Sequence, residues 1–596
     1  MTTPPSLLLS RRDLDFLLFE WLRVDELTGR ERFAEHSRET FDAVLDLCAE
    51  LAEEQFAPHL KAADRQEPTL DGDRVTVIPE VGAALHALGR AGVIGAVMDA
   101  SVGGLQLPAT VAAAGFAWFQ AANVATSAYA GLTAGNAGLL LRYGTPEQID
   151  TWVRPMAEGR YSGTMCLSEP HAGSSLAELT TRAEPQPDGT YRLTGTKMWI
   201  SGGDHELTEN IVHLVLARIP DAPAGVRGIS LFLVPKHLPG GERNDVVPGG
   251  LNHKMGYRGT VNALLNLGEG RYLPGGRPGA VGFLVGEANR GLAAMFHMMN
   301  EARIGVGAGA MAVGYTGYLK SVAYARDRRQ GRQARDRGTT GPQVPIIEHA
   351  DVRRMLLAQK SYVEGALALI LYSNRLVDEA QTGATPQARA DAVRLLDTLT
   401  PISKAWPSQW CLAANDLAIQ VHGGYGYTRD YDVEQHYRDN RLNPIHEGTN
   451  TVQGLDLLGR KAIAEGGAGL RALLGKIIGT AERAVAAGGE LAGYGTALAG
   501  TAQRIGEVTA RLWATGDAET ALANSAAYLD AVGHTVVAWL WLEQALLAGN
   551  RTEPFYAGKR HAARYFFRYE LPKVAVSLDL LASLDRTLVD MDPAWF

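Results

Sequence analysis

Apolar residues recur at three- and four-residue intervals over most of residues 1–160, which is the pattern of amphipathic helices. One clear stripe runs along Phe41–Ala52. A second helix has a well-marked start, because Thr145 can cap it, Pro146 suits the first helical position and Gln148 completes a capping box. The pattern therefore predicts an N-terminal helical domain.

The spacing of apolar residues changes after Gly159, where short apolar runs alternate with turns that contain glycine. Such runs are typical of antiparallel strands joined by tight connections. The predicted strands are Thr190–Ile200, Ile211–Ala217, Ile229–Val234 and Thr260–Asn266. We therefore predict a middle β domain over residues 161–290.

Helical spacing returns after the β domain and predicts a helical bundle over residues 291–464. An additional helical domain, residues 465–596, follows a glycine-rich link at Gly466–Gly467. Strands confined to one block do not alternate with helices as in a doubly wound sheet, so the predicted fold class is α+β and mainly α. The run Gly305–Gly314 keeps the helical rhythm and follows no strand, which favours close helix packing over a phosphate loop.

Composition narrows the function classes. The formal charge of -8 argues against general affinity for nucleic acid or anionic membrane, since both need a surplus of cations. The most apolar run, Val536–Leu542, is too short to cross a bilayer and predicts a core helix. The chain starts without an export signal, and its cysteines, Cys48, Cys166 and Cys411, are scattered and odd in number, which favours a reducing cytoplasm.

Several catalytic motifs are missing: the sequence has no P-loop, HExxH, paired CxxC or GxSxG. His422, His436 and His446 are spaced too widely for a metal site, and we predict no metal. Taken alone, the arginine-rich stretch Arg326–Arg337 favours a solvated helix end and loop, and the alternative is a clamp on a pyrophosphate or phosphate group.

Two separated stretches carry the clearest signal. The first comprises MCLSEPHAGSSLAELTTRAE and the later TYRLTGTKMWISGG, and the second is QVHGGYGYTRDYDVEQHYRDNRLNPIHEGTNTVQG. They resemble the acyl-CoA dehydrogenase family, in which the first set belongs to a middle antiparallel β-barrel domain and the second to the C-terminal helical bundle. The resemblance covers about residues 35–465, and the long C-terminal block resembles a larger subgroup with an additional helical domain.

The resemblance implies a catalytic base at Glu447, in the HEGT segment where many family members carry their glutamate. The α-hydrogen of a thioester is weakly acidic, so a carboxylate that removes it needs a dry pocket that raises its pKa. Gly448 would allow a tight turn beside a cofactor. His446 stands where a tyrosine is common, which indicates a more polar pocket with a group that titrates near neutral pH.

The resemblance also implies FAD as the hydride acceptor. Amides and hydroxyls of the middle domain are expected to hold the polar edge of the isoalloxazine, and an indole to cover one ring face. The residues that match these roles are Leu167, Ser168, Trp199 and Ser201, and Ser174 matches a pyrophosphate contact. Core packing of Trp199 within a strand stays open as an alternative.

In the family, a neighbouring subunit completes the FAD site with an arginine and a Gln-x-x-Gly-Gly turn. The residues that match these features are Arg328, Gln330, Gln420, Gly423 and Gly424. Thr449 and Thr451 follow the base and are expected to touch the dinucleotide as well. A shared site implies a homodimer or a dimer of dimers.

Substrate contacts are expected from Asn300 and Arg303, which share one helix face and match a family contact near the CoA portion. A helix-surface salt bridge accounts for Arg303 equally well.

Together these expectations describe an α,β-dehydrogenation of an acyl-CoA thioester to the 2-enoyl-CoA, with electrons leaving through an electron-transfer flavoprotein. Three alternatives stay open: a flavin oxidase or monooxygenase on the same fold, a dehydrogenase of carrier-protein thioesters, and a non-catalytic relative that binds flavin or DNA. The net negative charge of the chain and the presence of Glu447 disfavour the non-catalytic relative.

Overall fold

The structure is a computed structural model that describes residues 6–333, 338 and 340–596. Part of the arginine-rich stretch, residues 334–337, lies outside the described residues. The chain forms two compact units. One unit is Arg32–Gly305, and the other joins the N-terminal segment up to Glu31 with Val306–Phe596. The long helix α8 (Gly291–Asp327) contains the boundary between them.

The unit Arg32–Gly305 starts with helices, as the apolar stripes predict. These helices are α2 (Arg38–Leu51), α3 (Leu60–Arg65), α4 (Pro79–Arg90), α5 (Ala109–Tyr143), α6 (Pro146–Gln148) and α7 (Arg154–Ala157). The predicted capping box is confirmed: the Gln148 amide donates to Thr145 Oγ1 at 3.2 Å, and the Thr145 amide donates to Gln148 Oε1 at 3.1 Å. A small hairpin of β1 (Thr69–Asp71) and β2 (Arg74–Thr76) interrupts the helices.

The second half of this unit is a β domain with one sheet of eight strands. The strands are β3 (Tyr161–Cys166), β4 (Arg182–Pro185), β5 (Tyr191–Ser201), β6 (Asn210–Arg218), β7 (Ile229–Pro235), β8 (Val246–Leu251), β9 (Asn262–Leu267) and β10 (Ala280–Leu284). The four predicted strands are confirmed as β5, β6, β7 and β9. The pairings β10–β7–β6–β4–β5–β10 close a ring, so the barrel expectation holds.

The expectation of a purely antiparallel domain needs correction. β3 pairs with β6 in parallel along six residues, and β4 touches β6 in parallel at one pair, whereas the other pairings are antiparallel. A parallel pairing joins strands that are distant in sequence, and the apolar pattern of a strand does not specify its neighbours. The signal for the parallel partner was therefore missing from the sequence.

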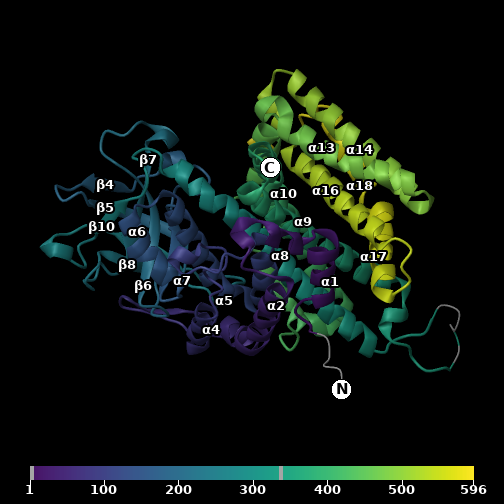
Figure 1. Cartoon of the computed structure of the whole chain (residues 1–596), viewed down its shortest axis with the longest axis horizontal. Coiled ribbons are helices and arrows are strands. Elements are labelled where there is room, and N and C mark those ends of the chain that lie inside the picture. Colours follow the sequence, from purple (N-terminus) through teal and green to yellow (C-terminus); the bar gives the residue numbers. More distant parts are fainter. Residues whose placement is uncertain (1–5, 334–337, 339) are drawn as a thin grey trace. The chain divides into compact units, whose positions relative to one another are not determined.

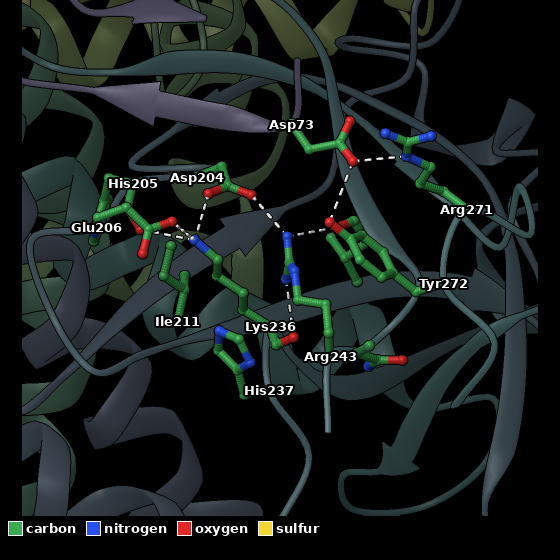
Figure 2. A network of polar contacts seen from close by, with 12 residues as sticks. Asp73, Asp204, His205, Glu206, Ile211, Lys236, His237, Arg243, Arg271 and Tyr272 are labelled. Carbon is green, nitrogen blue, oxygen red and sulfur yellow. Dashed lines mark hydrogen bonds and ion pairs between the residues drawn. The ribbon is translucent and has the colours of Figure 1, made fainter. Parts of the chain in front are cut away.

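A buried polar network fixes one end of this β domain (Figure 2). Lys236 Nζ donates to Asp204 at 2.7 Å and to Glu206 at 2.8 Å, and Arg243 donates to Asp204 at 3.2 Å. Lys236 and Asp204 are almost fully buried. Such a pair is costly to break, because loss of one charge leaves the other without its partner. The network ties the loop after β5 to the chain after β7.

The second unit is helical. Its helices, besides most of α8, are α1 (Arg11–Asp15), α9 (Ala350–Thr382), α10 (Pro386–His422), α11 (Val433–Asn440), α12 (Asn450–Asp456), α13 (Ala464–Ala487), α14 (Gly489–Ala514), α15 (Ala518–Leu522), α16 (Ser525–Ala548), α17 (Pro554–Tyr565) and α18 (Lys573–Ala582). In the yellow-green part of Figure 1, α16 lies beside α14 and α18.

The helix α16 contains the most apolar run of the sequence. By length and composition alone it could cross a membrane, but 83% of its most apolar window is buried inside the protein. Every residue of Val536–Leu542 is at most 3% exposed. The prediction of a core helix is confirmed.

Candidate active site

The four residues expected around an isoalloxazine lie at the ends of two strands of the β domain. Leu167 and Ser168 directly follow β3, and Trp199 and Ser201 lie at the C-terminal end of β5. The Met198 amide donates to the Ser168 carbonyl at 2.9 Å, which holds the two strand ends side by side. The structure therefore brings the four residues together.

Trp199 has an unusual backbone and an exposed ring. Its φ is +65°, in the left-handed region that side chains other than glycine rarely adopt, and the pairing of β5 with β9 is irregular between Lys197 and Ile200. A bulge re-aims the side chain it carries, and Trp199 is 60% exposed. The alternative of core packing for Trp199 is therefore wrong. A large exposed ring held by a strained backbone suits the face of a planar ligand.

Ser174, the expected pyrophosphate contact, lies on an exposed loop after β3, one residue before the cap of a short 3₁₀ turn at Leu176–Glu178. The loop starts from the buried Glu169, whose backbone amide and carbonyl exchange hydrogen bonds with Ala172 at 2.9 and 3.0 Å. This exchange makes the EPHAG turn compact, and it leaves the Ser174 side chain at the surface, where a ligand can reach it.

A second group of predicted residues gathers in the helical unit. A hollow of about 460 Å³ is lined by Arg328, Gln330, Gly423 and Gly424, together with Tyr324, Ile346, Val421, His422, Tyr425 and Thr428. Its volume is within the usual range for a small-molecule pocket. Residues almost a hundred positions apart in sequence thus line one concave surface, as expected of a site that holds part of a dinucleotide.

The end of α10 shapes this hollow. Gly423 has φ +61° and ψ −140°, which only glycine adopts easily, and a Cβ at Gly423 or Gly424 would meet no atom within 4 Å. The backbone is thus open to close approach. His422 stacks on Tyr324 at 4.3 Å between ring centroids, and burial lowers the pKa of this histidine. Gln420, by contrast, is exposed and does not line the hollow.

Glu447 lies in the turn between α11 and α12. Its φ is +54°, so the proposed base, like Trp199, has a left-handed backbone although it is not glycine. Gln453 Nε2 donates to the carbonyl of Glu447 at 3.1 Å and to that of Gly448 at 3.3 Å, which holds the strained turn against α12. Backbone strain of this kind persists only where the surroundings enforce it, and it is concentrated at functional sites.

The chain just before Glu447 is anchored by a buried network. Lys404 of α10 donates to the Asn443 carbonyl at 2.7 Å, and the Asn443 side chain donates to Asn440 Oδ1 at 2.9 Å. Asn440 in turn donates to Asn415 Oδ1 at 2.7 Å. All four side chains are fully buried. A buried network of this type, in which the polar groups are hydrogen-bonded, holds the turn in one conformation.

His446 belongs to this network and does not titrate near neutral pH, which corrects the expectation from the sequence. Its Nε2 donates to Asn443 Oδ1 at 3.0 Å. Desolvation, helped by the nearby Lys404 ammonium, lowers the pKa of His446 to about 3. The ring is therefore neutral and acts as a hydrogen-bond donor beside Glu447 at physiological pH.

We expect His446→Gln to flatten the acid side of the pH–stability curve. Because the folded pKa lies below the unfolded value, the wild-type chain loses stability as the pH falls from about 6.5, where the unfolded chain gains a proton that the folded ring refuses. Gln can still donate to Asn443 but does not titrate. Thermal unfolding between pH 7 and 4 measures the difference. An equally steep curve in the variant contradicts the assignment.

Thr449 and Thr451 follow the base but differ in setting. Thr449 is the N-cap of α12, and its Oγ1 accepts the Val452 amide at 3.3 Å. Thr451 is exposed on the first turn of the helix. Thr449 thus has a structural task as a cap, and its expected contact with the dinucleotide stays a prediction.

Asn300 and Arg303 lie one turn apart on α8. Arg303 is 4% exposed, and its Nη1 lies 3.5 Å from Asn300 Oδ1. Burial argues against a helix-surface salt bridge as the account of Arg303. The contact joins the two residues expected near CoA, and this expectation stays a prediction.

The chain matches sequence models of one family along almost its whole length. The models describe the acyl-CoA dehydrogenase N-terminal domain over residues 38–160, the middle domain over 164–267, the C-terminal domain over 289–462, and an acetyl-CoA dehydrogenase C-terminal-like domain over 473–592. The chain is 36% identical over 545 residues to 3-methylmercaptopropionyl-CoA dehydrogenase of Ruegeria pomeroyi, covering 89% of each chain. The chain belongs to the acyl-CoA dehydrogenase family.

Other comparisons agree with the family. A broad-specificity linear acyl-CoA dehydrogenase of Mycobacterium tuberculosis is 34% identical and covers 98% of this chain and 99% of its own. A subunit of a caffeyl-CoA reductase–Etf complex of Acetobacterium woodii is 28% identical over 54% of this chain and 74% of its own. The fold matches an acyl-CoA dehydrogenase of Bacillus anthracis complexed with FAD, with a TM-score of 0.75, 20% identity and coverage of 94% and 93%.

FAD is the cofactor of this family, and the residues of this chain suit it. The β domain offers an exposed indole beside two strand ends, and the helical unit offers a hollow with an arginine and two glycines. A planar ring system and a pyrophosphate need these two kinds of surface. The predicted class, an FAD-dependent acyl-CoA dehydrogenase with an additional helical domain, is confirmed.

The sequence did not indicate several residues that support the site. Lys404, Asn443 and Gln453 support the turn of Glu447, and Tyr324 and His422 form a wall of the hollow. Lys404 and Gln453 lie on helices and Asn443 lies in the turn after α11, and the apolar pattern gives no sign that any of them is buried. A signal for His422 was present, since it lies inside the matched QVHGG segment.

Proposed function

We propose that this acyl-CoA dehydrogenase oxidises an unbranched acyl-CoA, with Glu447 as the base that takes the α-proton. The observation that carries the proposal is the strained, anchored turn that presents Glu447, in the segment where family members carry their base. A carboxylate on a rigid turn keeps one orientation, as a positioned general base requires.

Different residues of the chain take the proton and hold the cofactor. Glu447 takes the proton, and His446 donates to Asn443 and, because its ring is neutral, adds no positive charge beside the carboxylate. Trp199 and the strand ends at Ser168 and Ser201 offer the ring face and polar groups for the cofactor. When FAD is bound, it supplies the acceptor for the β-hydride.

The substrate class is inferred from the relatives' names. The Ruegeria protein acts on 3-methylmercaptopropionyl-CoA and the mycobacterial protein on linear acyl-CoAs. Both substrate types are unbranched chains, and identities of 36% and 34% along most of the chain favour a similar substrate here. We therefore propose an unbranched acyl group, with a role in fatty acid β-oxidation or a related catabolic sequence.

An anaerobic titration tests this proposal. Purified holoenzyme is mixed with butyryl-CoA or 3-methylmercaptopropionyl-CoA, and isobutyryl-CoA provides a branched control. We expect bleaching of the flavin absorbance with the unbranched thioesters and much less with the branched one. No bleaching with any acyl-CoA would refute the function. Rapid reoxidation by air after bleaching would instead favour an oxidase.

Electron-transfer flavoprotein is the proposed electron acceptor, supported by the similarity to a subunit of an Etf complex. The three cysteines are buried as free thiols, which is consistent with our proposal of a reducing cytoplasm.

We further propose a homodimer or a dimer of dimers, because the hollow at Arg328 matches the surface with which family members complete a neighbour's FAD site.

Arg328→Ala is expected to weaken FAD binding by about tenfold or more, because it removes a permanent charge that can hold the pyrophosphate. The retained flavin per chain after gel filtration measures the effect. Arg329→Ala is the matched control, since Arg329 is exposed, donates to the Gln343 carbonyl and does not line the hollow. Equal flavin content in the two variants contradicts a clamp at Arg328.

A further inference from the structure

A buried ion pair lies directly beneath the strand ends assigned to the flavin. Lys197 Nζ is 3.0 Å from Glu169 Oε1, and the two residues are 0% and 2% exposed. Lys197 precedes Trp199 by two residues, and Glu169 directly follows Ser168. The pair thus connects the two segments that line the proposed cofactor site.

Four hydrogen bonds hold Glu169 in place independently of the lysine. Its two carboxylate oxygens accept hydrogen bonds from the amides of Thr180 and Thr181 at 2.8 and 3.0 Å, and from their hydroxyls at 2.7 and 2.5 Å. With Lys197 added, these contacts outweigh burial and lower the pKa of Glu169 to about 2. The carboxylate is therefore a fixed anion to which Lys197 is attached.

Lys197 has a second acceptor, the main-chain carbonyl of Leu167, at 3.1 Å. In a trans peptide the C=O and the following N–H point to opposite sides, and no described peptide bond is cis. A carbonyl of Leu167 that faces the buried ammonium therefore turns the Ser168 amide the other way, away from the lysine. Ser168 is one of the residues expected to donate to the flavin edge.

We propose that Lys197 is a positioning residue for the cofactor: fixed by Glu169, it holds the Leu167 carbonyl and so aims the Ser168 N–H at the flavin edge. This inference rests on the FAD site proposed at these strand ends. Lys197 itself does not touch the cofactor. Its charge makes the hydrogen bond to Leu167 strong, which keeps the peptide plane in one orientation.

Three variants separate positioning from mere stability. Lys197→Met removes the donor to Leu167 and leaves the Glu169 charge buried. The double variant Lys197→Met/Glu169→Gln removes both charges but still lacks the donor. Lys236→Met is the matched control, since it breaks a buried pair of the same type in the same β domain, at Asp204, without a hydrogen bond to Leu167 or Ser168 (Figure 2).

The readouts are the thermal midpoint of the apoprotein, the Kd for FAD from flavin fluorescence, and the visible spectrum and midpoint potential of the reconstituted flavin. Lys197→Met should lower the midpoint temperature and raise the Kd about tenfold or more, since a charge-assisted hydrogen bond is lost. The double variant should recover much of the thermal midpoint yet keep the weak Kd and the shifted spectrum and potential. Lys236→Met should lose thermal stability with an unchanged Kd.

Recovery of the wild-type Kd and spectrum in the double variant would overturn the proposal, because Glu169 neutralisation would then be the only task of Lys197. A wild-type Kd in Lys197→Met would overturn it as well. If Lys197→Met does not fold, the double variant alone decides by the same criterion. A wild-type protein that binds no FAD would instead refute the proposed function, so the two failures are distinct.

Discussion

Glu447→Gln is expected to lower kcat by about a thousandfold or more while the enzyme keeps its yellow FAD, since a positioned general base contributes on the order of 10²–10⁴-fold. Gln preserves the size and the backbone of the turn but cannot take a proton from the α-carbon. Dehydrogenation of butyryl-CoA with an artificial electron acceptor measures kcat, and the flavin absorbance of the purified variant measures retained FAD.

The chain offers a closely matched control for this substitution. Glu465 is also a glutamate with a left-handed backbone, at φ +50°, and lies in the same unit, but it pairs with Arg394 at the surface. Glu465→Gln changes the same side chain on the same type of backbone, so its kcat should stay near wild type. A Glu447→Gln enzyme that still bleaches fully with an acyl-CoA would rule out Glu447 as the base.

The sequence predicts much of the fold because the signals are local. A capping box needs only Thr145 and Gln148, and a core helix shows itself by the unbroken apolar run Val536–Leu542. The parallel pairing of β3 with β6 and the grouping of residues 6–31 with the C-terminal helices are different. They depend on contacts between distant segments, for which a periodic pattern carries no information.

The same contrast between local signals and distant contacts decides which site residues the sequence predicts. The resemblance predicts Glu447, Trp199 and Arg328 as site residues, because chemistry restricts the residue types there. They do not identify Lys197, since a lysine within a strand pattern usually belongs to the solvent face, and only the structure shows it fully buried against Glu169. The exposure of Trp199 depends on a bulge in the pairing of β5 with β9, which alternation of residues cannot reveal.

The additional helical domain is joined to the family's common helices by a buried charge cluster. Lys559 of α17 forms ion pairs with Asp13 of the N-terminal segment and with Glu364 of α9, at 2.8 Å for the latter, and donates to Gln544 of α16 at 2.9 Å. Lys559 is 0% exposed, Asp13 1% and Glu364 3%. The Tyr315 hydroxyl donates to Asp13 at 2.9 Å. The N-terminal segment, α9, α16 and α17 thus meet at one ammonium.

Lys559→Met is expected to lower the free energy of unfolding by about 3–5 kcal/mol, because it leaves two buried carboxylates that face each other without their shared cation. The Glu364 carboxylate keeps Lys360, but Asp13 loses its ion pair. Chemical denaturation followed by far-UV circular dichroism measures the loss. The N-terminal segment should also become a site of early proteolysis, since Asp13 anchors it to the helices.

Two further variants test whether the buried charges are the cause. Arg564→Met removes a cation from the same helix, but its pair with Glu490 at 2.7 Å is near half exposed, so the cost should be at most about 1 kcal/mol. Lys559→Met/Asp13→Asn removes one stranded charge together with the ammonium and should recover part of the loss. If the double variant is as unstable as Lys559→Met, or Arg564→Met costs as much, packing and not charge joins the additional domain to the rest of its unit.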